Sequence, residues 1–350
     1  MDGQPKILDR SPELFPYSLD AQSDSVSFIR LDRADYERAS FLDARILTPR
    51  ANPHPMPWPR VAASIESAGL AERCGYLFHI GHVGSTLLSR LIGAHPQAFA
   101  LREPMILRQL AQHQGESAAR PGAWTEPEFD ARVEGCVKLL SRTFAAQQRA
   151  VVKATSFVSE LAQRLMSRPA APAAAMMFVS PETYLATILG GPNSRQEAKV
   201  LTRSRLRRLH RRIGHDAWRL ESFSEGEALA LGWACEAAAL AEAALTAGGR
   251  ILRIDFDRFL ADPAALLQST LRHFDIDATT SDVNAILEGP DMIRYSKAPE
   301  YAYDAALRRE ILDQARADHG AEIKRGLDWL ERAVAQFAPV AQAVSFALPG

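Results

Sequence analysis

The chain has 350 residues, of which 47% are hydrophobic and 24% are charged, proportions typical of a soluble globular protein. They exclude bulk disorder, a collagen-like repeat and a disulfide-rich scaffold. The 41 basic and 42 acidic residues leave a net charge of −1. No global field therefore favours nucleic acid or an acidic membrane, and any anion site must be built locally.

The cysteines and the apolar stretches narrow the class further. Cys74, Cys136 and Cys235 are too few and too scattered for a zinc site or a disulfide framework, which indicates reduced thiols. The N-terminus is polar and lacks the apolar run of a signal peptide, so we expect a cytoplasmic protein. The most apolar stretch, Ala228–Ala247, contains Glu236, which is typical of a buried helix and not of a membrane span.

The first segment of the chain lacks regular patterning. Prolines crowd positions 49–59, so we expect residues 1–60 to form an arm or cover with one or two short elements. A single α/β domain is predicted for 61–340, and a loose tail for 341–350.

From residue 61 onward, short apolar runs alternate with helical patterns. The predicted strands are Tyr76–Ile80, Ala150–Lys153, Ala174–Val179 and Arg250–Asp255. The predicted helices are Val61–Arg73, Leu87–Ile92, Phe129–Gln148, one beginning near Ser156, Pro181–Leu189, Ala228–Ala247, Pro263–Phe274 and Asp304–Phe337. This alternation predicts an α/β fold, a parallel sheet flanked by helices on both faces.

A dense basic stretch follows the third predicted strand and its helix. Lys199–Arg212 carries cations at seven positions, no acid, and a narrow apolar stripe. The pattern predicts a surface helix that packs by one edge.

A glycine-bearing loop links the first predicted strand to its helix, with the sequence Gly81-His82-Val83-Gly84-Ser85-Thr86. The N–H groups at a helix start are unpaired and the helix dipole favours negative charge, so this loop is a candidate phosphate site. It is not a Walker A loop, because no lysine follows Gly84 to reach a triphosphate. A tight turn with Ser85 as helix cap is the structural alternative.

Three motifs, in chain order, resemble those of the sulfotransferases. Phe78–Leu88 looks like the family's 5′-phosphosulfate loop, Leu101-Arg102-Glu103-Pro104 is similar to a strand end of the tyrosylprotein and bacterial branches, and Ile251–Pro263 resembles a later strand-to-helix junction. The resemblance covers about residues 75–276. It implies a P-loop-like sulfotransferase fold that binds 3′-phosphoadenosine 5′-phosphosulfate (PAPS) and transfers its sulfuryl group to a hydroxyl or amine acceptor without a metal.

The resemblance also implies catalytic residues. Glu103 matches the glutamate of the tyrosylprotein branch and is the candidate general base, with burial expected to raise its pKa toward working pH. Lys153 ends a strand where ligands bind in open α/β sheets and is the candidate cation for the bridging oxygen. The small-molecule branch places a histidine where this chain has Thr155, which favours Glu103 as base. His82 replaces the family's loop cation, either as a neutral hydrogen-bond donor or as a protonated imidazole.

The donor-binding set follows from the same matches: Gly81, His82, Val83, Gly84, Ser85, Thr86, Leu87, Thr187, Arg195 and Lys297. The arginine that the family uses for the 3′-phosphate is matched by Val179 and is missing, so Arg195 and Lys297 are the candidate substitutes. Tyr295 is one of several aromatic candidates for stacking on adenine.

Two other functions stay open at the level of sequence. One is a phosphotransferase that uses a nucleoside triphosphate, which the missing Walker lysine disfavours. The other is a non-catalytic protein of the same fold that binds a nucleotide or a partner, suggested by the two absent cations. The acceptor, whether small molecule, glycan or peptide, is expected to bind among residues 1–60, 105–130 and 190–225, with no membrane partner and no nucleic acid.

Overall fold

The computed structural model describes residues 8–48, 52–116 and 124–348. Its centre is a five-stranded parallel sheet in the order β5 (Ala98–Arg102), β6 (Arg149–Lys153), β4 (Gly75–His79), β7 (Ala174–Phe178) and β8 (Ile251–Asp255). β4, β5 and β7 are buried along their whole length, which is why they read as continuous apolar runs and not as alternating ones. The predicted α/β fold with a parallel sheet is confirmed.

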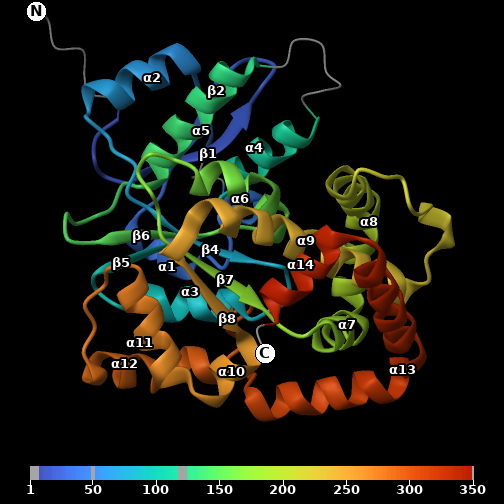
Figure 1. The fold of residues 1–350 in the computed structure, drawn as a ribbon. Helices are drawn as coiled ribbons and strands as arrows, with labels where there is room; N and C mark the ends of the chain where they lie inside the picture. The colour runs from blue at the N-terminus through green and yellow to red at the C-terminus, as the bar shows by residue number, and fades with distance from the viewer. Residues whose placement is uncertain (1–7, 49–51, 117–123, 349–350) are drawn as a thin grey trace, which may run out of the picture.

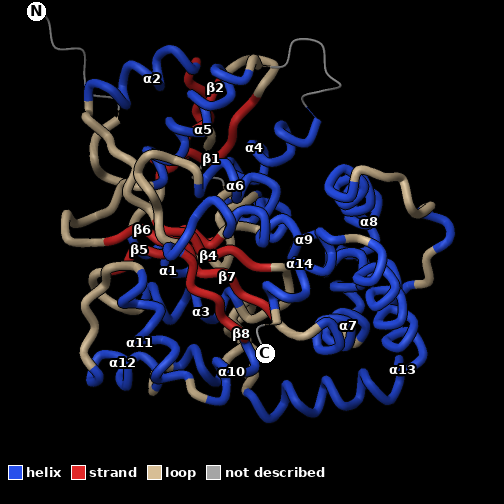
Figure 2. Tube along the Cα trace, viewed as in Figure 1, coloured by secondary structure: helices blue, strands red, loops and turns tan. Residues whose placement is uncertain are grey.

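Helices cover both faces of this sheet (Figure 1). α3 (Ser85–Gly93) and α11 (Pro263–His273) lie below it as drawn, and α6 (Ser159–Met166) and α9 (Glu225–Ala247) lie above it. The red strands in Figure 2 are thus enclosed by blue helices. Among the described residues, α9 is the one helix long and apolar enough to cross a membrane, and most of it is buried inside the protein. It is the core helix that its alanine-rich sequence predicts.

The remaining helices complete the layers. α4 (Met105–Glu116) and α5 (Glu126–Leu140) follow β5, α7 (Pro181–Leu189) and α8 (Pro192–Ile213) follow β7, and α10 (Phe256–Ala261) and α12 (Thr280–Leu287) flank α11. α13 (Ala305–Gln336) packs on α7 and α9. α5 begins at the capping box of Thr125 and Glu128 and ends eight residues before the predicted boundary, because the apolar pattern that suggested a longer helix continues into a turn.

The N-terminal region is more regular than the sequence predicts. β1 (Leu14–Asp20), β2 (Ser25–Arg30) and β3 (His54–Pro57) form an antiparallel sheet, followed by α2 (Trp58–Ser67), with α1 (Arg33–Arg38) between β2 and β3. The prolines of β3 are tolerated because β3 is an edge strand. Phe15, Phe28 and Ile29 are buried in the main core, so this sheet is part of one folded body with the rest.

Two further expectations need correction. The tail predicted to be loose over 341–350 is helical up to Ala347, because α14 (Ala338–Ala347) buries Val340 and Ala343 against α9. The basic helix α8 was predicted to lie on the surface and to pack by one edge, but two of its arginines are buried. Arg205 and Arg208 lie on the side of α8 that faces α9, because α9 supplies them with a carboxylate partner.

That partner is Glu236, a fully buried side chain in the middle of α9. It accepts hydrogen bonds from Arg205 Nε at 3.0 Å and from Arg208 Nη2 at 2.7 Å. Burial alone would raise the pKa of Glu236, but the charges of Arg208 and Arg205 lower it to about 2. A fully buried carboxylate in an apolar helix is thus explained by two arginines that lie far from it in sequence.

Candidate active site

The candidate site is a cavity of about 590 Å³ at the carboxyl ends of β4, β5 and β6. Ligands of open parallel sheets bind at this end, near the strand where the winding order reverses. The predicted residues that line it are His82, Val83, Gly84, Ser85, Thr86, Leu87, Glu103, Lys153, Thr187 and Lys297. The structure therefore brings together residues from five separate parts of the chain: the loop 82–87, the strand ends at Glu103 and Lys153, the helix residue Thr187, and Lys297 in a loop near the C-terminus.

The loop after β4 has the geometry of an anion cradle. Gly84 caps α3 in the left-handed region at φ 70°, and the first intrahelical bond of α3 runs from the Leu88 N–H to the Gly84 carbonyl at 3.2 Å. The N–H groups of Ser85 to Leu87 precede that bond and have no intrahelical acceptor. The three residues line the cavity, at the positive end of the helix dipole.

Thr86 adds a hydroxyl to this cradle. Its Oγ1 is buried and has no hydrogen-bond partner within the described residues, although the residue lines the cavity. Buried polar atoms in native proteins are almost always paired. A phosphate oxygen placed in the loop would supply the missing partner, so the residues present fit a phosphate group.

The backbone is strained at two of the proposed catalytic residues. His82 and Glu103 have φ values of 55° and 54°, in the left-handed region that non-glycine residues rarely adopt. Each such residue costs on the order of 1 kcal/mol and persists only where the surroundings enforce it. At Glu103 the enforcement is visible, because its N–H donates to the Lys153 carbonyl at 2.7 Å.

Glu103 and Lys153 form a buried ion pair at the base of the cavity. Thr155 Oγ1 donates to the other Glu103 oxygen at 3.3 Å. Burial would raise the pKa of Glu103, but the charge and hydrogen bond of Lys153 more than offset it and hold the pKa below its usual range. The expectation of a net rise in the pKa of Glu103 is therefore wrong, because the effect of the Lys153 ion pair exceeds that of burial.

Burial lowers the pKa of the two histidines at the end of β4 and in the following loop. For His82, burial first and then the charge of Lys297 lower the pKa to about 3, which favours the neutral imidazole in the ligand-free protein. Burial also holds the pKa of His79 well below its usual range. His79 Nδ1 accepts the Gly81 N–H at 3.0 Å, so the proton of its ring belongs on Nε2.

His79 is a site residue that the sequence motif contains but that its pattern does not single out. Its Nε2 is buried, has no hydrogen-bond partner within the described chain, and lies 3.9 Å from Glu103 Oε1. The ring therefore presents a donor to the cavity beside the carboxylate. The only signal in the sequence is a polar residue at the end of an otherwise apolar strand.

The N-terminal arm packs beside the Glu103–Lys153 pair. Leu42 N–H donates to the Arg102 carbonyl at 2.6 Å, and Arg102 Nε donates to the Ala39 carbonyl at 2.6 Å. The Phe41 ring then lies 5.6 Å from Lys153 Nζ. Arg102 is therefore a structural residue that docks the arm, and the arm helps to exclude water from the Glu103–Lys153 pair.

The loop that contains Ser296 and Lys297 forms another wall of the cavity. Arg90 Nε donates to the Ser296 carbonyl at 2.8 Å and Arg90 Nη2 to Ser40 Oγ at 2.8 Å, which ties this loop to α3 and to the arm. Lys297 and Arg294 line the cavity and are exposed. Of the aromatic candidates for adenine, Tyr295 lines the cavity with Tyr301 and Tyr303.

Of the residues predicted to bind the 3′-phosphate, the structure brings some to the cavity and leaves one outside it. Val179 is buried, so the end of β7 carries no cation. Arg195 is not among the residues that line the cavity, because its guanidinium pairs with Glu225 at 2.6 Å. Lys297 and Thr187 do line it, and Arg308 joins them unpredicted, held by Asp257 at 2.7 Å.

No group of three or more histidine, cysteine, aspartate or glutamate side chains that could hold a metal ion occurs within residues 8–48, 52–116 and 124–348. The three cysteines are buried and free.

The chain resembles known proteins in fold and not in sequence. No protein-family model and no curated protein matches the chain. Among solved structures it is similar to a sulfotransferase domain from the curacin biosynthetic pathway (12% identity, 71% of this chain and 99% of that one, TM-score 0.41). It is also similar to a sulfotransferase from Alicyclobacillus acidocaldarius (15%, 79% and 96%, 0.39) and to a sulfotransferase domain from the Synechococcus PCC 7002 olefin synthase (15%, 79% and 95%, 0.40). At these identities the likeness concerns the fold alone, in the family that the sequence motifs resemble.

Proposed function

We propose that the protein is a sulfotransferase that uses PAPS as donor, with Glu103 as general base. One observation carries the proposal: the buried, unpartnered hydroxyl of Thr86 in a helix-start cradle faces the same cavity as the Glu103–Lys153 pair. A candidate anion site and an acid–base pair thus share one cavity.

In the proposed reaction the acceptor oxygen attacks sulfur in line with the bond to the 5′-phosphate. That sulfur–oxygen bond breaks, the sulfuryl group passes to the acceptor, and the phosphate leaves with its electron pair. The N–H groups of Ser85 and Thr86 and the Thr86 hydroxyl bind the phosphate as its charge grows. This is the contribution expected of a cradle that is already in place before reaction.

The acceptor's proton goes to Glu103. The carboxylate is ionised at neutral pH because Lys153 holds its pKa down, so it is ready to accept a proton. As the proton arrives, the pairing with Lys153 weakens, and the ammonium becomes available to the bridging oxygen nearby. The His79 Nε2 donor next to Glu103 is placed to bind a sulfuryl oxygen or the acceptor oxygen.

The test of this assignment is Glu103→Gln. Removal of a general base lowers turnover by roughly 10²- to 10⁴-fold, while the residues that would bind the phosphate are unchanged. We therefore expect sulfuryl transfer from PAPS to fall by at least about 100-fold and binding of adenosine 3′,5′-bisphosphate, measured by calorimetry, to stay within a factor of about three. Phenolic, aliphatic and amine acceptors are screened together because the acceptor is unidentified.

Glu288→Gln is the matched control, an exposed glutamate at the end of α12. It should keep wild-type turnover. Normal turnover in Glu103→Gln would refute the base assignment. Tight binding of magnesium–ATP in place of the bisphosphate would favour a phosphotransferase, and bisphosphate binding with no transfer to any acceptor class would favour a non-catalytic role.

A further inference from the structure

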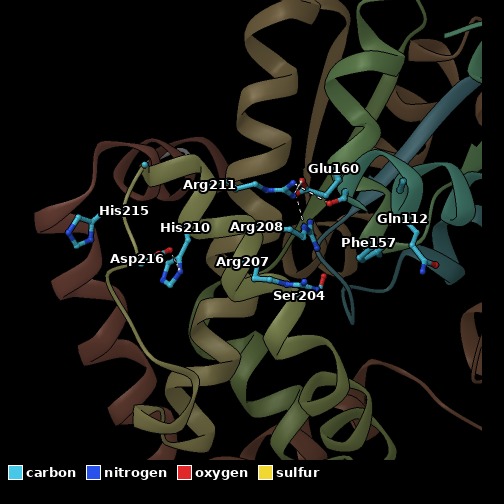
Figure 3. A pocket seen from close by; sticks show the side chains of 13 residues that line it. Gln112, Phe157, Glu160, Ser204, Arg207, Arg208, His210, Arg211, His215 and Asp216 are labelled. Carbon is cyan, nitrogen blue, oxygen red and sulfur yellow. Dashed lines mark hydrogen bonds and ion pairs between the residues drawn. The ribbon is translucent and has the colours of Figure 1, made fainter. Parts of the chain in front are cut away.

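A second cavity, of about 520 Å³, lies between α4, α6 and α8. Figure 3 shows Arg207, Arg208 and Arg211 projecting from α8 toward Phe157 and Gln112 on the opposite wall. Positions 204, 207, 208 and 211 share one face of a helix because they are three and four residues apart. The cavity is therefore lined on one side by a row of guanidinium groups.

The charges around this cavity do not cancel. Beneath it, Arg205, Arg208, Arg211 and Arg212 contact three carboxylates, those of Glu160, Glu236 and Glu242. Arg207 adds a further cation, is exposed, and has no hydrogen bond or ion pair within the described residues. The remaining lining acid, Asp216, pairs with His210 at 3.1 Å.

Arg207 and Arg211 are the guanidinium groups most available to a ligand, since Arg207 has no partner within the described residues and Arg211 makes only long contacts, among them one from Nη1 to the Gly115 carbonyl at 3.5 Å. Arg208 is held by Glu160 and Glu236 at 2.7 Å each, whereas the nearest carboxylate oxygen to Arg211 Nη2 is 3.6 Å away and its side chain is 54% exposed. Two guanidinium forks one helical turn apart suit the planar or tetrahedral oxygens of a carboxylate, sulfate or phosphate.

This cavity begins close to the candidate active site. Phe157 lines it and lies 5.2 Å from the Arg208 guanidinium, and Thr155, two residues earlier, contacts Glu103 at 3.3 Å. Two residues span at most about 7.6 Å between Cα atoms. Phe157 and Ala111 give this cavity an apolar wall beside its guanidinium groups.

We propose that Arg207 and Arg211 bind an anionic group of the acceptor, one separated by an apolar spacer of about 10–15 Å from the hydroxyl that faces Glu103. This rests on the proposed function for the identity of the reacting group. The arginine-lined cavity selects acceptors that carry a carboxylate, sulfate or phosphate at the far end, and it explains why α8 is dense in cations that the fold does not neutralise.

The test uses ω-(4-hydroxyphenyl)alkanoates of increasing chain length and their methyl esters as probes. Calorimetric titration, with and without saturating adenosine 3′,5′-bisphosphate, gives affinities that do not depend on turnover. A charge-assisted hydrogen bond contributes about 1.5–3 kcal/mol, so we expect the wild type to bind the best acid at least about 10-fold more tightly than its ester. The preference should peak at a span of about 10–15 Å.

The double variant Arg207→Gln/Arg211→Gln should lose this preference. Both side chains are exposed, so folding is expected to be unaffected, and a thermal melt checks it. Arg203→Gln is the control, another exposed arginine of α8 that does not line the cavity, and it should keep the preference.

Equal binding of acid and ester by the wild type, or a preference that survives in the double variant, would overturn the proposal. A preference that depends on the two arginines but not on probe length would also overturn it, because the cavity would then bind free anions and not the acceptor. Absence of bisphosphate binding, with the acid preference intact, would instead count against the sulfotransferase proposal.

Discussion

At the scale of single residues, the site is defined by polar atoms that the fold buries without a partner. α3 contains two such hydroxyls, Thr86 Oγ1 and Ser89 Oγ. They lie three residues apart on one helix, but only Thr86 lines the cavity. The pair therefore offers a natural comparison between a hydroxyl that meets ligand and one that does not.

Thr86→Val should weaken nucleotide binding without weakening the fold. Valine has nearly the same shape and removes a polar atom that has no protein partner, so the free energy of unfolding should stay within about 0.5 kcal/mol or rise. Loss of a hydrogen bond to a charged phosphate should lower the affinity for adenosine 3′,5′-bisphosphate by about 10- to 100-fold. Calorimetry and urea unfolding measure the two quantities.

Ser89→Ala is the matched control for Thr86→Val. It should leave nucleotide affinity unchanged. A similar loss of affinity in both variants would mean that α3 itself is perturbed. Unchanged affinity in Thr86→Val would refute the binding of the phosphate in this loop.

The sequence placed most candidate residues in the cavity but did not predict their charge states. The residues 82–87 come together because they are consecutive at a strand end, and Lys153 follows because parallel strands end at one edge. The sequence could not show that Lys153 would meet Glu103, or that the pKa of Glu103 would fall and not rise. Nor could the sequence show that Arg195, the candidate substitute at the 3′-phosphate, pairs with Glu225, which is thirty residues away in sequence and 2.6 Å away in space.

At the scale of elements, the loop after β4 and the helix after β8 fit together through one glycine. A Cβ on Gly84 would lie 2.0 Å from the Phe256 ring of α10. The glycine therefore serves two needs, a left-handed φ and a close approach between two βα junctions. These junctions are the first and the last of the three motifs that resemble the sulfotransferases.

Gly84→Ala should destabilise the protein by about 2–5 kcal/mol, from left-handed strain and overpacking together. Gly69→Ala separates the two causes, since Gly69 has φ 59° and nothing within 4 Å of an added Cβ. It should cost about 1–2 kcal/mol from strain alone. Urea unfolding measures both variants.

The double variant Gly84→Ala/Phe256→Ala should be less destabilised than the sum of its two single variants, because removal of the ring relieves the clash. Strict additivity, or equal costs at Gly84 and Gly69, would show that the contact with Phe256 does not matter.

The elements themselves were predictable where their patterns are strong. Pro181–Leu189 was predicted to the residue, since a serine cap, a proline and an apolar run mark its start. The N-terminal sheet was missed. Its strands are short, and prolines occupy its edge strand, where the missing N–H groups face no partner.

At the scale of the whole molecule, the buried histidines make stability depend on pH. In the unfolded chain His82 takes up a proton near its usual pKa of 6.5, whereas burial lowers its pKa in the folded protein to about 3. Between these values the unfolded state binds more protons, so stability falls as pH falls. The contribution is complete above about pH 7 and is progressively lost on acidification.

Between pH 6.5 and 5, His82 should account for a loss of about 1.6 kcal/mol in the free energy of unfolding. His82→Asn should therefore show a shallower decline than the wild type in urea unfolding at these two pH values. His54→Asn, on the exposed edge strand β3, should decline as steeply as the wild type. Identical slopes for wild type and His82→Asn would mean that the loop histidine is protonated or solvated in the folded protein.

The sequence by itself determined the class of fold and the position of the anion loop, because both depend on local patterns: apolar runs of strand length, helical spacing, and a glycine loop between them. Only the tertiary structure decided where positive charge is available. A chain with a net charge of −1 distributes its cations by which carboxylates they meet, and those meetings are distant in sequence. Glu236 and Glu160 pair with Arg205 and Arg208, Glu225 pairs with Arg195, and Arg207 and Lys297 are left to face their cavities.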